Sequence, residues 1–462
     1  MIKITKMRVF ELVMINLLVV DNIRTLSLGA KYGLSLIIYY LLAAICFFIP
    51  TALVAAELSS NFPISGGIYI WIKEAFGKPV AFVTIWIQWF YNIIWYPTIL
   101  SLVASLFISI LPIHLIYQKL YLISTILICF WSMSLLNLCK LKYTSLISNL
   151  AAIIGTLIPM LFIIILGIIW FFSNQKIAIT LDLNHLWPNL SHSNNLVFFV
   201  GIIFAYVGIE MPASHASEVI NPQKNYPRAL FYSVILILST LILASLAIAI
   251  VIPADHLNLI IGFMQAFKQF LHYFHLDFLM IPLTLMIIIG ALGSTSVWII
   301  GPAKGLLIAS KDGCLPKFFS KSIKEHIPIN IIFVQAIIVS FLCLIFIYSP
   351  SIIDSFWLLT AMSAILSMCI YLIMFLAAIK LRYSKKRYCE NNTFKIPGGK
   401  IVLIIICILG ISTVLFAIIT GLLPPTQLVI SNVVHYEIIL ISGLIISILT
   451  PLIIYFTRPL QN

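Results

Sequence analysis

Two charged residues, Arg24 and Glu210, lie near the middle of apolar runs that are long enough to cross a lipid bilayer. The residues around them are Val20-Asp21-Asn22-Ile23-Arg24 in one run and Tyr206-Val207-Gly208-Ile209-Glu210 in the other. A charge at bilayer depth is costly, so such side chains usually face a cavity, a transport pathway or a partner group. These two segments are therefore the first places where chemistry with a solute or an ion is expected.

Residues that disrupt helices accompany both charges. Gly208 tolerates backbone angles that other residues avoid, and Pro212 lacks an amide donor and clashes with the preceding turn. In the first run, Asp21 and Asn22 compete for backbone hydrogen bonds. We expect both helices to be interrupted in mid-bilayer, where freed peptide groups line a cavity and an exposed helix N-terminus attracts a carboxylate. The alternative for the second run is a proline kink that neighbouring helices repair.

Several other side chains are candidates for gating or coupling. His215 and Glu218 are three residues apart and share one helix face, where they can form a pH-sensitive pair near the cytoplasmic mouth. Trp298 is either a hydrophobic lid over the substrate or filler between helices. Arg24 is either a snorkelling arginine with Asp21 as its partner, or it faces an acidic substrate group or Glu210.

No cofactor or metal site is expected. The eight cysteines are scattered, with no close pair. His272 and His275 form the one close histidine pair, and no cysteine or further histidine lies close to them in the sequence. A loop helix at the membrane interface explains this pair better than a metal site does.

The composition is that of an all-α, polytopic membrane protein. Apolar residues make up 62% of the chain and charged residues 9%, whereas soluble domains carry roughly 25% charged residues. A spanning helix needs about 20 apolar residues. The segment 256–276 is amphipathic and is expected to lie along the outer membrane interface. About twelve spans are predicted, at 9–30, 34–58, 80–110, 120–138, 144–172, 196–218, 229–253, 278–303, 328–349, 353–379, 401–423 and 437–456.

The net charge of +13 is a signal of membrane topology and does not indicate nucleic-acid binding. With twelve spans, most of the 27 lysines and arginines lie on the side of the N-terminus. The positive-inside rule then places both termini in the cytoplasm of a multi-pass cell-membrane protein. The residues left on the opposite side are Arg24, Lys31, Lys119, Lys176 and Lys268.

The spans divide as five, five and two within a single transmembrane domain, 1–462. The first repeat covers about 9–172, the second about 196–379, and the extra helices about 401–456. In a five-plus-five inverted repeat, spans 1 and 6 are equivalent and run in opposite directions. The two expected interruptions fall in those two spans, as a secondary transporter requires.

A series of short motifs runs along the chain in a fixed order. They are Pro50, Glu57, Ser65-Gly66-Gly67-Ile68-Tyr69, Gly208-Ile209-Glu210, Asn221-Pro222, Tyr226-Pro227, Trp298 and Asp312-Gly313-Cys314-Leu315-Pro316. Taken in order, these motifs resemble the amino acid–polyamine–organocation family of permeases, and the match covers most of residues 8–330. The strings Tyr206-Val207-Gly208-Ile209-Glu210 and Ser214-His215-Ala216-Ser217-Glu218 carry a stronger likeness to its glutamate/γ-aminobutyrate antiporter branch.

The resemblance implies the five-helix inverted-repeat fold and amino-acid transport, by exchange or by proton-coupled uptake. Carried over by position, the substrate-facing residues are Asn22, Ile23, Arg24, Tyr206, Val207, Gly208 and Ile209, and the gating or coupling residues are Glu210, Trp298, His215 and Glu218. The family's glycine-serine-glycine turn is absent from span 1, where Asp21-Asn22-Ile23-Arg24 stands instead. The antiporter branch can carry a C-terminal plug, and this chain ends at Asn462, so plug gating is not expected.

The leading hypothesis is an amino-acid permease that works by alternating access, with an amino-acid substrate, the lipid bilayer and protons as its partners. Glu210 with Arg24 opposite favours a zwitterionic or acidic substrate over a dicationic one. A non-transporting sensor that signals through the 380–400 loop is the alternative. An enzyme is not expected, because no nucleophile, metal or acid pair is visible at one depth.

Overall fold

The fold is described from a computed structural model that covers residues 7–110, 118–138, 141–173, 175–188, 193–323, 327–344, 346, 352–384, 393–423 and 433–457. Among these residues there are helices, turns and two isolated bridges, and no strand. Nine of the described helical stretches are long and apolar enough to cross a membrane. Two interrupted helices and one shorter apolar helix, Ile329–Leu342, complete the predicted set of spans. The all-α, polytopic prediction is confirmed.

The elements of the first half run from the first span to the fifth. Spans 2 and 5 each contain a short π-helical segment between two α-helices, which the sequence did not predict. The elements are α1 (Val9–Val20), η1 (Ile23–Thr25), α2 (Leu26–Ala30), α3 (Leu36–Ala43), η3 (Ala44–Phe48), α4 (Ile49–Asn61), α5 (Ile68–Phe76), α6 (Lys78–Ile110), α7 (Gln118–Asn137), α8 (Leu141–Ala152), η4 (Ile153–Leu157) and α9 (Ile158–Phe172).

The elements of the second half run from the sixth span to the tenth, and two further helices follow them. An amphipathic helix, α12, lies in the predicted 256–276 segment and buries its apolar face. The elements are α10 (Ser193–Ala205), η6 (Met211–Glu218), α11 (Pro222–Val251), α12 (Gly262–Tyr273), α13 (Met280–Lys311), α14 (Ile329–Leu342), α16 (Ile352–Tyr383), α17 (Gly399–Gly421) and α18 (Val433–Thr457).

Two spans extend beyond their predicted ends. The span predicted at 229–253 begins earlier, because Pro222 occupies the first turn of α11, where a missing amide donor costs nothing. The span predicted at 278–303 continues to Lys311. Both extensions carry polar residues that an apolar window excludes, although their helical geometry is intact.

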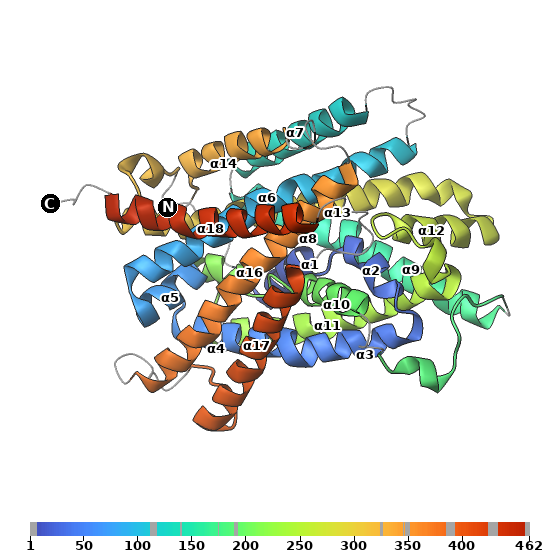
Figure 1. The fold of residues 1–462 in the computed structure, drawn as a ribbon, viewed down its shortest axis with the longest axis horizontal. Helices are drawn as coiled ribbons and strands as arrows, with labels where there is room; N and C mark the ends of the chain where they lie inside the picture. The colour runs from blue at the N-terminus through green and yellow to red at the C-terminus, as the bar shows by residue number, and fades with distance from the viewer. Residues whose placement is uncertain are drawn as a thin grey trace.

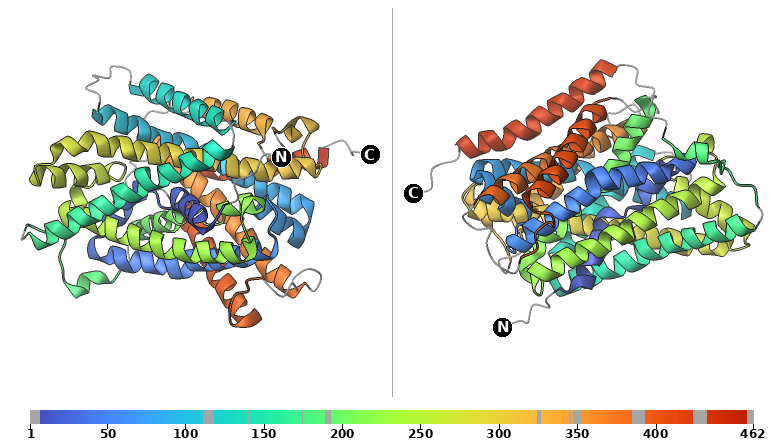
Figure 2. Two further views of the ribbon diagram at one scale, coloured as in Figure 1. Left: turned by 180° about the vertical axis from the view of Figure 1, so that it is seen from behind. Right: turned by 90° about the horizontal axis from the view of Figure 1, so that it is seen from below.

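The interrupted helices occupy the centre of the bundle. Figure 1 shows α1 and α10 near the middle, with other helices around them. Every residue of α1 from Leu12 to Val20 is buried, and α1 packs against α8, α11 and α13. In contrast, α18 lies along the outside of the bundle (Figure 2) and packs on α6 and α16. The core of the protein is therefore built around the two interrupted spans.

Close packing between spans 5 and 8 depends on two glycines. A Cβ atom placed on Gly155 of η4 would lie 2.2 Å from the backbone nitrogen of Gly290 in α13. No side chain fits between these two backbones, so glycine at both positions allows the helices to touch. Small residues at such a contact allow two helix backbones to approach closely.

The ends of α5 and α13 are joined by a charged cluster. Asp312 accepts hydrogen bonds from the Tyr69 hydroxyl at 2.7 Å and from Lys73 Nζ at 2.5 Å. Lys78 Nζ donates to the Asp312 carbonyl at 3.0 Å. Burial raises the pKa of the Tyr69 hydroxyl, and its hydrogen bond to Asp312 raises that pKa further. This cluster fixes the end of span 8 that continues from Trp298.

Candidate functional site

The first span is interrupted where predicted. Helix α1 ends at Val20, and Asp21 and Asn22 leave the helical path before η1 begins at Ile23. The Asn22 side chain accepts a hydrogen bond from the backbone N–H of Arg24 at 3.1 Å. The Asn22 carbonyl accepts the Thr25 hydroxyl at 2.8 Å. The residues that weaken the helix therefore also satisfy the peptide groups that the interruption frees.

The sixth span is interrupted at Gly208. Helix α10 ends at Ala205, and η6 begins at Met211. Gly208 has a φ of +115°, and a Cβ atom there would lie 2.3 Å from Val19 Cγ1 and 2.7 Å from the Trp298 ring. Only glycine fits this backbone and this space. The turn in span 6 is therefore packed against the end of α1 and against α13.

Glu210 is held by two side chains that the sequence analysis did not identify. The Tyr371 hydroxyl of α16 donates to Glu210 Oε2 at 2.6 Å, and it accepts the backbone N–H of Gly208 at 2.7 Å. Gln88 Nε2 of α6 donates to Glu210 Oε1 at 3.3 Å. The Tyr371 hydroxyl thus satisfies the backbone N–H of Gly208, which the interruption frees. Gln88 is a polar residue in an apolar span, which is a signal that could have identified it; Tyr371 carries none.

Arg24 pairs with neither of its two predicted protein partners. Its Nη1 donates to Thr98 Oγ1 of α6 at 3.0 Å, and its guanidinium lies 5.3 Å from the ring centre of Phe356. Arg24 is 8% exposed. Among the described residues no carboxylate forms an ion pair with it. The snorkelling interpretation with Asp21 as partner is therefore wrong, as is a contact with Glu210.

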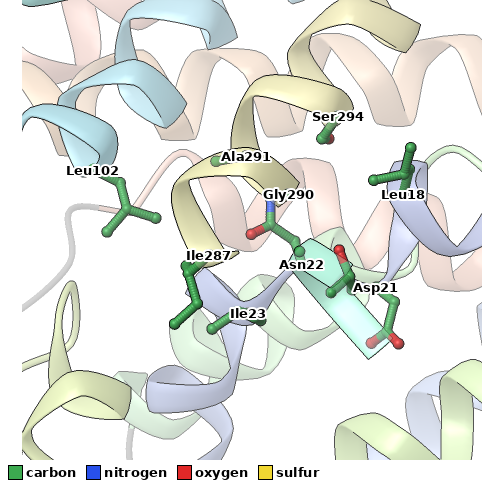
Figure 3. A pocket seen from close by; sticks show the side chains of 11 residues that line it. Leu18, Asp21, Asn22, Ile23, Leu102, Ile287, Gly290, Ala291 and Ser294 are labelled. Carbon is green, nitrogen blue, oxygen red and sulfur yellow. The ribbon is translucent and has the colours of Figure 1, made fainter. Parts of the chain in front are cut away.

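The substrate-facing residues predicted from the sequence fall into two groups in this conformation. Asn22 and Ile23 line a small cavity of about 20 Å³ (Figure 3). That is room for a water molecule and too little for an amino acid. The complete lining is Leu18, Asp21, Asn22, Ile23, Leu102, Gly155, Thr156, Ile287, Gly290, Ala291 and Ser294.

The second group, residues 206–209, is not part of that lining. The Tyr206 ring stacks on Phe48 with centroids 4.4 Å apart, and its hydroxyl donates to the Tyr40 carbonyl at 3.4 Å. Val207 and Ile209 are also buried. In this conformation the side chains of residues 206–209 are therefore packed in the core, and the Gly208 N–H is bonded to Tyr371.

Trp298 lies between the interruption of span 6 and α6. Its ring packs against Tyr91 and Trp95, with centroid distances of 6.1 and 5.9 Å. It is 4% exposed and lies next to Gly208. The aromatic side chain therefore covers the turn at Gly208 from the side of α13, a position that both the lid and the filler interpretations allow.

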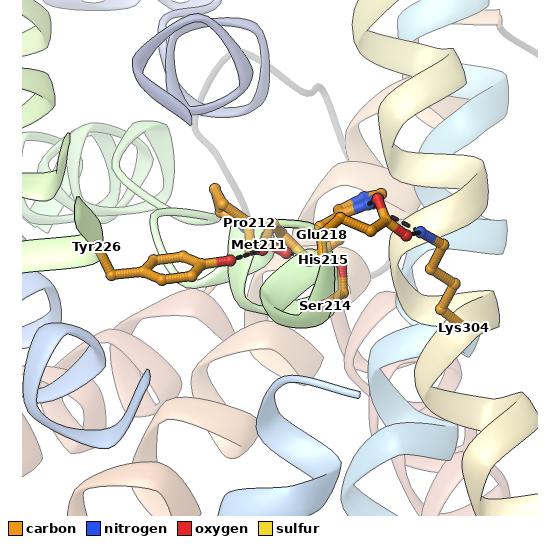
Figure 4. A network of polar contacts seen from close by, with 7 residues as sticks. All are labelled: Met211, Pro212, Ser214, His215, Glu218, Tyr226 and Lys304. Carbon is orange, nitrogen blue, oxygen red and sulfur yellow. Dashed lines mark hydrogen bonds and ion pairs between the residues drawn. The ribbon is translucent and has the colours of Figure 1, made fainter. Parts of the chain in front are cut away.

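His215 and Glu218 form the predicted pair, and a third residue joins them (Figure 4). His215 Nδ1 lies 3.0 Å from Glu218 Oε2. Lys304 Nζ of α13 lies 2.6 Å from Glu218 Oε1 and 2.8 Å from His215 Nδ1. The Tyr226 hydroxyl donates to the carbonyl of Pro212 at the other end of η6. The sequence analysis missed Lys304 because it belongs to another span.

No three histidine, cysteine or carboxylate side chains of the described residues come together as a metal site. His272 instead lies 3.5 Å from Asp277, and both side chains are exposed. The charged and polar groups at the interruptions can act on a solute through hydrogen bonds and charge.

Comparison with known proteins agrees with this chemistry. The model of the family described as amino acid permease matches residues 13–444. An uncharacterized transporter of Legionella pneumophila is 44% identical over 96% of this chain and 95% of its own length. A glutamate/gamma-aminobutyrate antiporter of Lactococcus lactis is 28% identical over 92% and 85%. A "probable agmatine/putrescine antiporter" of the same species is 24% identical over 86% and 83%.

Proposed function

The chain belongs to the amino acid permease family, and on that premise we propose that it moves zwitterionic or acidic amino acids across the cell membrane by alternating access. The family and the related transporters establish amino-acid transport and exclude an enzyme. Exchange of one amino acid for another, or uptake coupled to protons, is our proposal for how the transport proceeds. Asn22, Ile23, Arg24 and residues 206–209 are the proposed substrate-binding groups.

Arg24 carries the proposal for the substrate class. It is a buried cation at the interruption of span 1, and its described neighbours are a hydroxyl and an aromatic ring. A buried charge without an ionic partner costs free energy, and a carboxylate of the substrate would relieve that cost. A dicationic substrate would add a like charge instead. Arg24 therefore favours substrates that carry a carboxylate.

The interruption of span 6 supplies the second proposed contact. The N–H of Gly208 is bonded to the Tyr371 hydroxyl in this conformation. A substrate carboxylate would accept this N–H instead, at the positive end of the helix that follows, while the substrate amino group would replace the hydroxyl as the donor to Glu210. Glu210 then lies beside the amino group of a zwitterion, and Trp298 closes over the turn. The rearrangement of Tyr371 and Trp298 is the proposed gating step.

Topology and internal symmetry are part of the same proposal. We place both termini in the cytoplasm, supported by the distribution of lysine and arginine. We assign the first repeat to about 9–172 and the second to about 196–379, supported by interruptions in the first span of each half. His215 and Glu218 are the proposed gating residues at the end of η6.

The test is counterflow in proteoliposomes with all twenty amino acids, γ-aminobutyrate and polyamines, with and without a pH gradient. We expect glutamate or γ-aminobutyrate to exchange and polyamines to be excluded. The name of the Lactococcus lactis relative supports that choice of substrates. Binding without any flux would favour a sensor, which no observation here supports.

The matched variants are R24Q, R24K and K268Q. Loss of a hydrogen bond to a charged group costs about 1.5–3 kcal/mol, so R24Q is expected to weaken the apparent affinity for glutamate by about tenfold or more. R24K keeps the charge without the planar fork and should fall between R24Q and the wild type. Lys268 is exposed on α12, so K268Q controls for loss of a positive charge. Equal affinities in R24Q and wild type would contradict the role of Arg24.

A further inference from the structure

One buried carboxyl group has no role in the site described so far. Asp21 is 1% exposed and lies where α1 gives way to the interruption of span 1. Among the described residues no cation forms an ion pair with it, because Arg24 turns toward Thr98. A buried carboxylate without a cation is strongly disfavoured, and such a group takes up a proton instead.

The hydrogen-bond geometry around Thr240 of α11 indicates where that proton is. Thr240 Oγ1 lies 2.8 Å from Asp21 Oδ2 and also 2.8 Å from the Leu236 carbonyl oxygen, one turn earlier in its own helix. A threonine hydroxyl has a single proton to donate, and in helices it commonly donates to that preceding carbonyl. If Asp21 were ionised, one of these two short contacts would join two oxygens with no proton between them.

A proton on Asp21 satisfies both contacts at once. Asp21 Oδ2 then donates to Thr240 Oγ1, and Thr240 donates to the Leu236 carbonyl. Asp21 Oδ1 has no hydrogen-bond partner among the described residues, a position that costs less for a neutral carbonyl oxygen than for an anion. The arrangement fits a neutral carboxylic acid.

The surroundings of Asp21 provide a place for water and few competing charges. Asp21 and Ser294 line the same small cavity, and Ser294 Oγ is also without a hydrogen-bond partner among the described residues (Figure 3). The cavity residues from η4, α6 and α13 include no titratable side chain. From other elements, the titratable side chains of the described residues that act on Asp21 are Tyr40 and Tyr206. The Tyr40 hydroxyl bonds to Ser245, and the Tyr206 hydroxyl bonds to the Tyr40 carbonyl.

We propose that Asp21 is a proton-binding site of the transport cycle, which carries a proton in the present conformation and releases it to water when the interruption of span 1 rearranges. The proton fastens the interruption to α11 through Thr240. Its loss leaves an anion that needs hydration, so the ionised form favours a conformation in which the cavity widens. This inference rests on the proposed transport function for its meaning, but the proton itself can be observed without transport.

The first test compares the infrared spectra of purified wild type, D21N and E210Q in a detergent without ester groups. Wild type at neutral pH is expected to show the carbonyl band of a protonated carboxylic acid, which D21N lacks and E210Q retains. Asparagine can donate to Thr240 as the protonated acid does, so D21N is expected to fold. A band that persists in D21N, or no such band in wild type, would overturn the proposal.

The second test measures labelled glutamate and γ-aminobutyrate uptake in proteoliposomes, with and without an imposed pH gradient. For each substrate, the quantity compared is the ratio of the uptake with the pH gradient to the uptake without it, because this ratio does not depend on the absolute rate. A difference of about one pH unit supports about tenfold accumulation for one proton per cycle. We expect D21N to reduce the ratio to about one, and D277N, at an exposed carboxylate, to keep the wild-type ratio.

The outcomes separate this inference from the proposed function. If wild type transports neither substrate, the proposed function is in question, and the infrared band still decides the state of Asp21. If D21N keeps the wild-type response to the gradient, Asp21 is not the coupling site, although the protein is a transporter. If D21N shows no flux, the infrared result alone decides whether Asp21 carries a proton.

Discussion

Replacement of Tyr371 by phenylalanine tests how the interruption of span 6 is closed. The hydroxyl of Tyr371 makes two hydrogen bonds, at 2.7 Å with the N–H of Gly208 and at 2.6 Å with Glu210. If the substrate replaces that hydroxyl, both bonds stabilise the substrate-free protein and oppose binding. Y371F removes this competition and leaves the Gly208 amide without a partner until substrate arrives.

The size of the effect follows from the bonds that are lost. A hydrogen bond contributes about 1 kcal/mol, and one to a charged group about 1.5–3 kcal/mol. Some of this free energy is recovered by relaxation, so we expect a net change of about 1–2 kcal/mol in favour of binding. That corresponds to a five- to thirtyfold lower half-saturation concentration, with a lower melting temperature of the substrate-free protein.

The assay is concentration-dependent counterflow of glutamate together with thermal unfolding in detergent, for Y371F and for Y96F as control. Tyr96 is a buried tyrosine of α6 whose hydroxyl accepts one bond from Gln335 at 3.4 Å, away from the interruption. A higher half-saturation concentration in Y371F would show that the tyrosine binds the substrate directly. An unchanged value would refute the idea that it competes for the Gly208 amide.

Two further substitutions test the geometry of the site. G208A places a Cβ 2.3 Å from Val19 at a φ of +115°, whereas G399A, at a φ of +77°, meets no atom within 4 Å. We expect G208A to abolish transport and lower the melting temperature, while G399A shows only backbone strain of about 1–3 kcal/mol. Similar losses in the two variants would contradict the close packing at Gly208. K304Q removes the lysine that pairs with Glu218 in a buried site and should destabilise the protein by about 3–5 kcal/mol, measured by thermal unfolding. The double variant E218Q/K304Q should recover much of that loss. No recovery would show that Glu218 and Lys304 are not coupled.

The interruptions were predictable because their causes are local. Asp21 and Asn22 weaken a helix by their own side chains, and Gly208 and Pro212 do so through their backbones. The apolar periodicity likewise predicts the spans and the amphipathic helix α12. These features depend on residues within a few positions of one another, which a single sequence displays directly.

The partners of the charged residues were not predictable in this way. Tyr371, Lys304 and Thr240 lie 161, 86 and 219 residues from the carboxylates that they contact. Nothing in an apolar span distinguishes a tyrosine that bonds a distant amide from one that fills space. Arg24 illustrates the limit, since two protein carboxylates were considered for it and the structure supplies Thr98 and Phe356 instead.

The segment before α1 meets the end of η6 through main-chain hydrogen bonds. The N–H of Met7 donates to the Glu218 carbonyl at 2.8 Å, and the N–H of Ile220 donates to the Met7 carbonyl at 2.9 Å. The two interrupted spans are thereby joined by backbone hydrogen bonds at one rim of the bundle. Alanine scanning does not test these hydrogen bonds, because it leaves every amide in place, whereas a proline at position 7 or 220 would remove one of them.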